Sequence, residues 1–372
     1  MKLKSLIVIL LISNLYVFAQ NNSVLYSFFV AGHTYGQPGI NNVGFHPPFK
    51  QKFPYIQSRS EIEFGVLTGD IVSPFPNAQD WDEIDAEIDT LALPIYFAVG
   101  NHDMENRPLF ESRYGITYFD FIYNNDLFIV LDPNIDGWSI TGSQLLFLQN
   151  SVSDNYSSKE NIFVFFHQIL WRENTNQFNY INWNSAVGRI NPVNFWSTVI
   201  PIFDAIPNDV YMFAGDLGAT WSTDVTFDRF NNIKLIASGM GDQNGENIIV
   251  VNVDSNKSVN YDLICLSDTN LSCLGELTDY LTVDSLITNI GLLENRNINS
   301  TIYPNPASEY FTVSTHQKST LKLFDIKGLL ILDLEYNSFS NQKINISNLD
   351  KGIYIAQLSS EKGRETRKII LQ

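Results

Sequence analysis

Short apolar runs, each followed by polar or glycine-rich residues, recur along the first two thirds of the chain. Runs of this length predict buried strands. We place these strands near residues 24–30, 62–68, 95–99, 127–131, 162–166, 209–214, 233–237 and 248–253. Apolar residues at helical spacing predict helices over residues 81–91, near 145–148 and over 193–206, the last kinked or ended at Pro201. The pattern predicts a domain of alternating strands and helices.

Three further segments differ from this pattern. Residues 36–60 are interrupted by glycine and proline and predict a long loop. Residues 266–300 are rich in Ser, Asn and Thr, with a Leu/Ile stripe from Leu277 to Leu293, and predict a linker with one helix. From residue 301 the chain alternates apolar and polar positions between Lys-Gly turn signals. We expect a small β-sandwich there, with strands near residues 311–314, 321–324, 330–334, 344–346, 353–358 and 368–371.

Several of the predicted strands end at a polar residue that can coordinate a cation. These residues are His33, Asp70, Asn101, His167 and Asp216. In α/β folds, ligands bind beyond the carboxyl ends of the strands. One such residue would indicate only a turn, but five in series predict groups that converge on one rim. Asn101 offers a neutral amide oxygen to a hard metal, and the adjacent His102 offers a proton donor near neutral pH.

The charge of the chain bears on its partners and on its division into domains. The net charge is −17, so nucleic acid and anionic membranes are not expected partners. Residues 301–372 carry 9 Lys and Arg against 7 Asp and Glu, which leaves −19 on residues 1–300. This asymmetry indicates two units of different character.

The N-terminus has the composition of a secretory signal peptide. Lys2 and Lys4 precede an apolar run from Leu6 to Ile12, and Ala19 offers a cleavage site. The alternative is a membrane anchor, but Ser13 and Asn14 interrupt the run well short of the ~20 apolar residues that span a bilayer. We therefore expect residues 1–19 to be removed, and no stable membrane insertion.

The two cysteines, Cys265 and Cys273, lie close together in the sequence. In an exported protein they are expected to pair and close a small loop. The alternative is two unpaired thiols.

The ordered series of motifs resembles the calcineurin-like metallophosphoesterase family over about residues 25–262. Gly69–Asp70, Gly100–Asp103 and His167 match the Gly-Asp, Gly-Asn-His-Asp and lone-histidine motifs of that family. The resemblance implies an α/β fold, a four-layer α/β/β/α sandwich over residues 20–265. It also implies a divalent metal site between two central sheets, with a small-molecule phosphate ester as substrate.

Two motifs depart from the family pattern. The Asp-x-His motif is Ala31–His33 here, and the Gly-His-x-His motif is Gly215–Gly218. One of the family's two metal sites therefore keeps only Asp70 and His33. His33 is then either a ligand or the remnant of a lost site.

The second site keeps its ligand set if a carboxylate can replace a histidine. By the family roles its ligands are Asp70, Asn101 and His167, with Asp216 in the substituted position. Asp216 is either that ligand or a solvated turn residue. The expected cofactor is a divalent ion (Mn, Fe, Zn, Mg or Ca), one rather than two, and a carboxylate shifts the preference toward harder ions.

The resemblance also implies roles in catalysis. His102 would protonate the leaving oxygen or stabilise charge in the transition state, and Asp70 would hold the metal. Arg172 is a candidate phosphate contact, with a surface arginine in a loop as the alternative. The expected function is a secreted, metal-dependent phosphoesterase acting on a phosphate mono- or diester. The alternatives are a non-catalytic secreted binding protein that keeps the fold, or a scaffold without a ligand.

The C-terminal segment resembles the type A C-terminal sorting domain of the type IX secretion system. The matching pieces are Tyr303–Ala307, Phe324–Gly328, Ile346–Gly352 and the terminal basic strand. The resemblance implies export by the type IX machinery through residues 301–372, to the cell surface or the medium. The alternative is a carbohydrate-binding or adhesive β-module.

Overall fold

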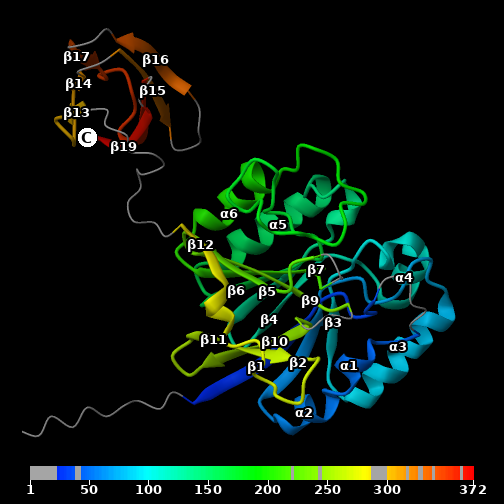
Figure 1. Ribbon diagram of the computed structural model, residues 1–372. Coiled ribbons are helices and arrows are strands. Elements are labelled where there is room, and N and C mark those ends of the chain that lie inside the picture. Colours follow the sequence, from blue (N-terminus) through cyan, green and yellow to red (C-terminus); the bar gives the residue numbers. More distant parts are fainter. Residues whose placement is uncertain are drawn as a thin grey trace, which may run out of the picture. The chain divides into compact units, whose positions relative to one another are not determined.

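The computed structural model describes two compact units, Met1–Asp284 and Ser285–Gln372 (Figure 1). The residues described are 23–37, 43–218, 222–241, 245–285, 300–315, 318–325, 330–336, 340–360 and 363–372. The expected signal peptide, residues 1–19, lies outside them. No helix among the described residues is long and apolar enough to cross a membrane.

The first sheet of the N-terminal unit has the strand order β11-β10-β1-β2-β3. Its strands are β1 (Val24–Ala31), β2 (Ile62–Leu67), β3 (Ile95–Phe97), β10 (Asn247–Asp254) and β11 (Val259–Cys265). The first three run parallel, and β10 and β11 add antiparallel at the β1 side. The carboxyl ends of β1, β2 and β3 therefore meet at one edge, which is where His33, Asp70 and Asn101 follow.

The second sheet has the order β12-β8-β9-β7-β6-β5-β4. Its strands are β4 (Phe119–Tyr123), β5 (Asp126–Val130), β6 (Asn161–Phe165), β7 (Asp209–Leu217), β8 (Thr226–Phe230), β9 (Ile233–Gly239) and β12 (Leu281–Ser285). The four central strands, β5, β6, β7 and β9, are parallel. His167 follows β6, and Asp216 lies near the end of β7.

The two sheets pack face to face through an aromatic core. Phe28 and Phe64 of the first sheet stack with centroids 5.2 Å apart, and Phe128 and Phe163 of the second sheet meet Phe28 edge-on. Burying one such ring contributes about 1.5–3 kcal/mol. This packing brings the carboxyl ends of the parallel strands of both sheets together at one edge of the sandwich.

Helices cover the outer faces of both sheets (Figure 1). Those on the first sheet are α1 (Pro47–Lys50), α2 (Phe53–Ser58), α3 (Ala78–Leu91) and α4 (Arg107–Tyr114), with the 3₁₀ turn η1 (Asp103–Asn106) before α4. Those on the second are α5 (Gly142–Asn155), η3 (Phe195–Val199) and α6 (Ile200–Asp204); a short turn, η2 (Pro133–Ile135), precedes α5. The result is the expected four-layer α/β/β/α sandwich.

Two segments differ from the sequence prediction because their prolines begin helices instead of interrupting them. Residues 36–60 contain α1 and α2 rather than only a loop, since proline occupies the first turn of each helix, where no amide partner is needed. Pro201 likewise lies in the first turn of α6, so residues 193–206 divide into η3 and α6.

The segment predicted as a linker begins differently from expectation. Residues 277–280 form the 3₁₀ turn η4 (Leu277–Tyr280), and β12 then joins the second sheet beside β8. The first compact unit therefore runs to Asp284. The rest of the predicted linker helix falls largely on residues 286–299, which lie outside the described residues.

The C-terminal unit is all β, as expected. One sheet has the order β13-β14-β17 and the other β16-β15-β18-β19. The strands are β13 (Ser300–Tyr303), β14 (Tyr310–Thr315), β15 (Ser319–Asp325), β16 (Leu330–Tyr336), β17 (Ser340–Asn345), β18 (Gly352–Ser360) and β19 (Gly363–Leu371). Alternate residues such as Phe311, Leu321 and Ala356 fill the core between the sheets.

Candidate metal centre

Glycines precede the functional side chains because the strand ends approach one another closely. A Cβ on Gly69 would lie 2.6 Å from the Gly100 nitrogen and from His167 Cβ, and Gly69 has φ +85°. A Cβ on Gly100 would lie 2.2 Å from the Asp70 nitrogen. Only glycine allows these turns to touch, so three strand ends from both sheets share one small volume.

Asp70, His167 and Asp216 form a buried group at this point. Their ligand atoms lie within 4.8 Å of one another. His167 Nε2 is 3.4 Å from Asp70 Oδ1 and 3.7 Å from Asp216 Oδ1. The other ring nitrogen, Nδ1, donates to Thr68 O at 2.8 Å. That bond leaves the Nε2 lone pair of the neutral ring directed at the two carboxylates.

A β-bulge places Asp216 in the group. The register between β7 and β9 shifts between Ala214 and Leu217. The amides of Gly215 and Asp216 both donate to the His167 carbonyl, at 2.9 and 3.1 Å. Bulges re-aim a side chain in this way. Asp216 is fully buried, so it is not a solvated turn residue.

The buried acceptors around this group lack donors. Asn101 Oδ1, His167 Nε2 and both carboxylate oxygens of Asp216 are buried without a hydrogen-bond partner among the described residues. Leaving such atoms unpaired costs about 1–3 kcal/mol each. Carboxylate, amide and imidazole acceptors in one pocket are the donor set of a divalent cation, so the residues present fit a metal ion.

The pKa values of Asp216, His167 and Asp70 are shifted by burial and by the charges of their neighbours. Burial raises the pKa of Asp216 to about 8, with His167 opposing the rise and Asp70 adding to it. Burial alone would lower the pKa of His167, but Asp70 and Asp216 together raise it to about 10. Burial would raise the pKa of Asp70, but the imidazoles of His167 and His102 outweigh it and hold that pKa well below its usual range. The pKa values of these three groups are therefore set by one another as well as by burial.

His102 lies at the open side of this group. Its Nε2 is 3.4 Å from Asp70 Oδ2, and its backbone amide donates to Asp70 Oδ1 at 3.1 Å. Nδ1 is 3.6 Å from Glu105 Oε1. The side chain is 20% exposed, whereas those of Asp70 and His167 are almost fully buried. His102 is therefore the most solvent-accessible of these three side chains.

His33 also lies beside this group, and a hydrogen bond to the backbone orients its ring. Its Nδ1 donates to Met240 O at 2.9 Å, and its Nε2 lies 3.8 Å from Asp70 Oδ2. Burial lowers the pKa of His33 to about 4, so the ring is neutral near pH 7. Tyr35 packs on this ring with centroids 4.6 Å apart, and it meets the His102 ring edge-on at 5.5 Å.

The backbone at Gly218 explains why this chain lacks one of the family's histidine ligands. Gly218 has φ +95°, and a Cβ there would lie 2.2 Å from the Met240 nitrogen. No histidine can occupy this position without moving β9. Ala31, in place of the family carboxylate, is completely buried.

Asp103 is a site residue to which the sequence analysis gave no role. Its carboxylate accepts the amides of Gly100 at 2.8 Å, Ile71 at 2.9 Å and Val72 at 3.2 Å. It thereby joins the turn after β2 to the turn after β3. The signal was its place at the end of Gly100–Asp103, but its partners are distant in sequence.

Arg172 lies in a separate hollow. Its guanidinium stacks on Trp183, with Cζ 4.1 Å from the ring centroid, and Nε donates to Ile181 O at 3.2 Å. The residues lining this hollow do not include Asp70, His167 or Asp216.

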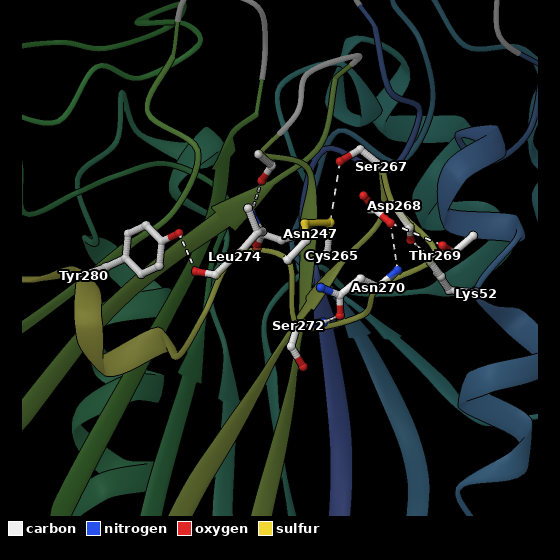
Figure 2. The surroundings of a disulfide bond; sticks show 12 residues. Lys52, Asn247, Cys265, Ser267, Asp268, Thr269, Asn270, Ser272, Leu274 and Tyr280 are labelled. Atoms are coloured by element: carbon white, nitrogen blue, oxygen red, sulfur yellow. Dashed lines mark hydrogen bonds between the residues drawn. A yellow bond between two sulfur atoms is a disulfide. The ribbon is translucent and has the colours of Figure 1, made fainter.

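Cys265 and Cys273 are joined by a disulfide at the end of β11 (Figure 2). The neighbouring amide of Leu266 donates to Glu246 O at 2.9 Å, and Glu246 Oε1 binds His46 Nε2 at 2.8 Å. The amide of His46 donates to Thr34 O. The disulfide loop is thus linked by hydrogen bonds to the segment that carries His33.

Comparisons with known proteins agree with these two units. Residues 33–239 match the family described as calcineurin-like phosphoesterase, and residues 301–372 match the secretion system C-terminal sorting domain. No curated protein matches the chain.

Two solved structures are weakly similar. One is a DUF3244 family protein with an immunoglobulin-like β-sandwich fold from Bacteroides vulgatus (15% identity, 21% of this chain, 88% of that chain, TM-score 0.19). The other is an engineered protein (10% identity, 91% of this chain, 72% of that chain, TM-score 0.17).

Proposed function

Because the chain belongs to the calcineurin-like phosphoesterase family, we propose that it hydrolyses a phosphate mono- or diester at a centre with one divalent metal ion. The observation that carries the proposal is the buried group of Asp70, His167 and Asp216, with its unpaired acceptor atoms. The sorting domain at residues 301–372 indicates export by type IX secretion, so the substrate would be met at the cell surface or outside.

Asp70, His167 and Asp216 would hold the ion, with Asn101 as the neutral fourth ligand. A divalent ion in such a site acts as a Lewis acid toward phosphoryl oxygens and lowers the pKa of water. Asp216 supplies a negative charge where the family has a neutral histidine. That charge favours Mn²⁺, Mg²⁺ or Ca²⁺ over softer ions.

His102 is the proposed proton donor. It is the partly exposed histidine of the site, and the hydrogen bond from its backbone N–H to Asp70 Oδ1 holds its backbone in place. A proton on Nε2 can pass to the oxygen of the leaving alcohol as the P–O bond breaks. Glu105 Oε1 lies 3.6 Å from Nδ1, on the other side of the ring.

His33 is the proposed proton acceptor. The Nδ1 hydrogen is committed to Met240 O, so the Nε2 lone pair faces Asp70. A neutral imidazole in this orientation can orient a water and accept its proton. This role would use a residue left from the reduced metal site, the one that keeps only Asp70 and His33.

A second candidate function is ligand binding without turnover. The observation that favours it is the loss of two family ligands, with Ala31 buried and Gly218 pressed against the Met240 backbone. A protein of this kind would hold the ion and a phosphate ligand but would release the ligand unchanged.

Turnover of p-nitrophenyl phosphate and bis-p-nitrophenyl phosphate by the Mn²⁺-loaded protein tests the proposal. Activity that falls in both Asp70→Ala and His102→Ala supports catalysis at this centre. Activity that is indifferent to both variants would contradict it. Stoichiometric Mn²⁺ with no turnover of any ester would favour the binding protein.

A further inference from the structure

The hollow that contains Arg172 has the features of an anion site. It has a volume of about 360 Å³. We call it the Arg172 hollow, and Trp183 is its aromatic wall. Its polar lining consists of Arg172, Glu173, Asn174, Thr175, Arg189 and Asn191. No step of the proposed hydrolysis uses it.

Arg172 differs from the other arginines of the N-terminal unit. Among the described residues of that unit, each other arginine has a carboxylate within 4.0 Å. Arg172 has two uncharged acceptors instead, Ile181 O and Asn174 Oδ1. Burial lowers the pKa of Arg172, with no acidic group acting against it. Arg172 is thus a partly buried guanidinium without a carboxylate partner among the described residues, in a chain of net charge −17, and an anion would supply the missing counterion.

Arg189 brings a second positive charge to the same wall. Its Cζ lies 5.1 Å from the Trp183 centroid and 5.2 Å from that of Trp138. Arg189 Nη2 lies 3.7 Å from Oε1 of its carboxylate partner, Glu173, and the Arg189 side chain is only 7% exposed. The two arginines and Glu173 leave a local charge of +1. Bringing like charges together costs free energy that a bound anion would recover.

The hollow is linked to the metal centre through one short segment. The amide of Asn184, next to Trp183, donates to Asp216 O at 3.2 Å, and its side chain donates to Leu217 O at 3.0 Å. Arg172 follows His167 by five residues in the chain, and its amide donates to Ile169 O. Both walls of the hollow are therefore anchored to residues that flank the metal ligands.

We propose that the Arg172 hollow binds a second anionic group of the substrate, a carboxylate or a further phosphate, while the scissile phosphate lies at the metal centre. The inference rests on the proposed function. The substrate class is thus a phosphate ester whose organic part carries its own negative charge. The guanidiniums of Arg172 and Arg189 lie against Trp183, and guanidinium N–H groups are suited to binding an oxyanion.

The test compares two series of phosphonates that cannot be hydrolysed. One series ends in a carboxylate and the other in a methyl group, over a range of chain lengths. Binding to the Mn²⁺-loaded full chain is measured by calorimetry, for the wild type, Arg172→Gln, Arg172→Lys and Arg189→Gln. Arg113→Gln, which removes an arginine paired with Asp85 between α4 and α3, is the matched control for net charge.

We expect one chain length at which the carboxylate improves affinity about 10- to 100-fold, the range for a charge-assisted hydrogen bond. That gain should vanish in Arg172→Gln and Arg189→Gln, shrink in Arg172→Lys, and persist in Arg113→Gln. Melting curves of all variants check that they fold.

The outcomes separate this inference from the proposed function. Equal affinity for both series at every length would overturn the Arg172 hollow while leaving the metal centre intact. A carboxylate gain that survives Arg172→Gln and Arg189→Gln would also overturn it. Affinity for the carboxylate series alone, lost in Arg172→Gln and without any ester turnover, would support the anion site and reject the hydrolase. Binding of neither series would overturn the Arg172 hollow, and the turnover measurements would then decide the proposed function.

Discussion

Asp103 Oδ1 accepts the backbone amide of Ile71 at 2.9 Å and so joins two ligand turns that lie on neighbouring strands. Ile71 follows Asp70, and Asp103 follows His102, so the bond ties the proposed metal ligand to the proposed proton donor. The carboxylate also accepts the amides of Val72 and Gly100. Asp103 is thus a positioning residue of the centre.

Replacing Asp103 with Asn should lower the free energy of unfolding by about 2–4 kcal/mol. The amide keeps one acceptor oxygen, while its NH₂ group faces backbone N–H donors that it cannot satisfy. Urea unfolding measures the loss. Asp82→Asn, at an exposed partner of Arg113, should cost less than about 1 kcal/mol. Equal midpoints for the two variants would refute the positioning role.

Loading with Mn²⁺ should give about one ion per chain by elemental analysis. Asp216→Ala should weaken that affinity about 100-fold or more, because loss of even an outer partner costs 10- to 100-fold. Asp209→Ala is the control, since it removes an exposed carboxylate from the same strand. Two ions per chain would mean that another group rebuilds the position flanked by Ala31 and Gly218.

His102→Ala should reduce kcat about 10²- to 10⁴-fold while the metal content stays unchanged. The loss should be larger for alkyl phosphates than for p-nitrophenyl phosphate, because a poor leaving group needs a proton more. Rates for a series of esters of graded leaving-group pKa give this comparison. A uniform loss across the series would instead assign His102 to binding.

Replacing both Cys265 and Cys273 with Ser should cost about 2–3 kcal/mol of stability, the entropy expected for closing a short loop. The loop is linked through Glu246 and His46 to the segment of His33, the proposed proton acceptor, so ester turnover should fall with it. Thermal unfolding with and without reductant checks the loss. Reductant should lower the melting temperature of the wild type and leave the double variant unchanged.

Asp228 should make stability depend on pH in the acidic range. Burial raises the pKa of Asp228 from 3.8 to about 6, although Tyr180 and the Val283 amide hydrogen-bond to it. The folded state therefore holds this proton more tightly than the unfolded state. The contribution is fully present below pH 3.8 and is lost as the pH rises through about 6.

Asp228→Asn should remove this dependence, because the neutral amide keeps an acceptor for Val283 and the Tyr180 hydroxyl can turn to accept from the amide. The stability difference between the variant and the wild type should grow in favour of the variant from pH 4 to pH 7. Chemical unfolding at several pH values measures the difference. A difference that is constant across the range would contradict the shifted pKa.

Local patterns identified the elements best where packing reinforces propensity. The buried strands β1, β2, β5, β6 and β7 were predicted because apolar runs need two covered faces. The elements α4, β4, β8 and β11 were missed, and so were the shorter elements α1, α2 and β12. Each shorter element is stabilised by distant partners: Phe49 packs on Phe29 in β1, and β12 pairs with β8. Such contacts leave no trace in a short window of sequence.

The sequence by itself determined the division into two units, the strands that end at coordinating groups, and the order of the motifs, since these depend on local hydrophobic period and residue chemistry. Only the tertiary structure decided which of those groups meet. The bulge in β7 turns Asp216 to His167, and Asp103 ties one turn to the next. Trp183 gathers Arg172 and Arg189 beside them. These contacts depend on how two sheets pack, which is a property of the whole core and of no single segment.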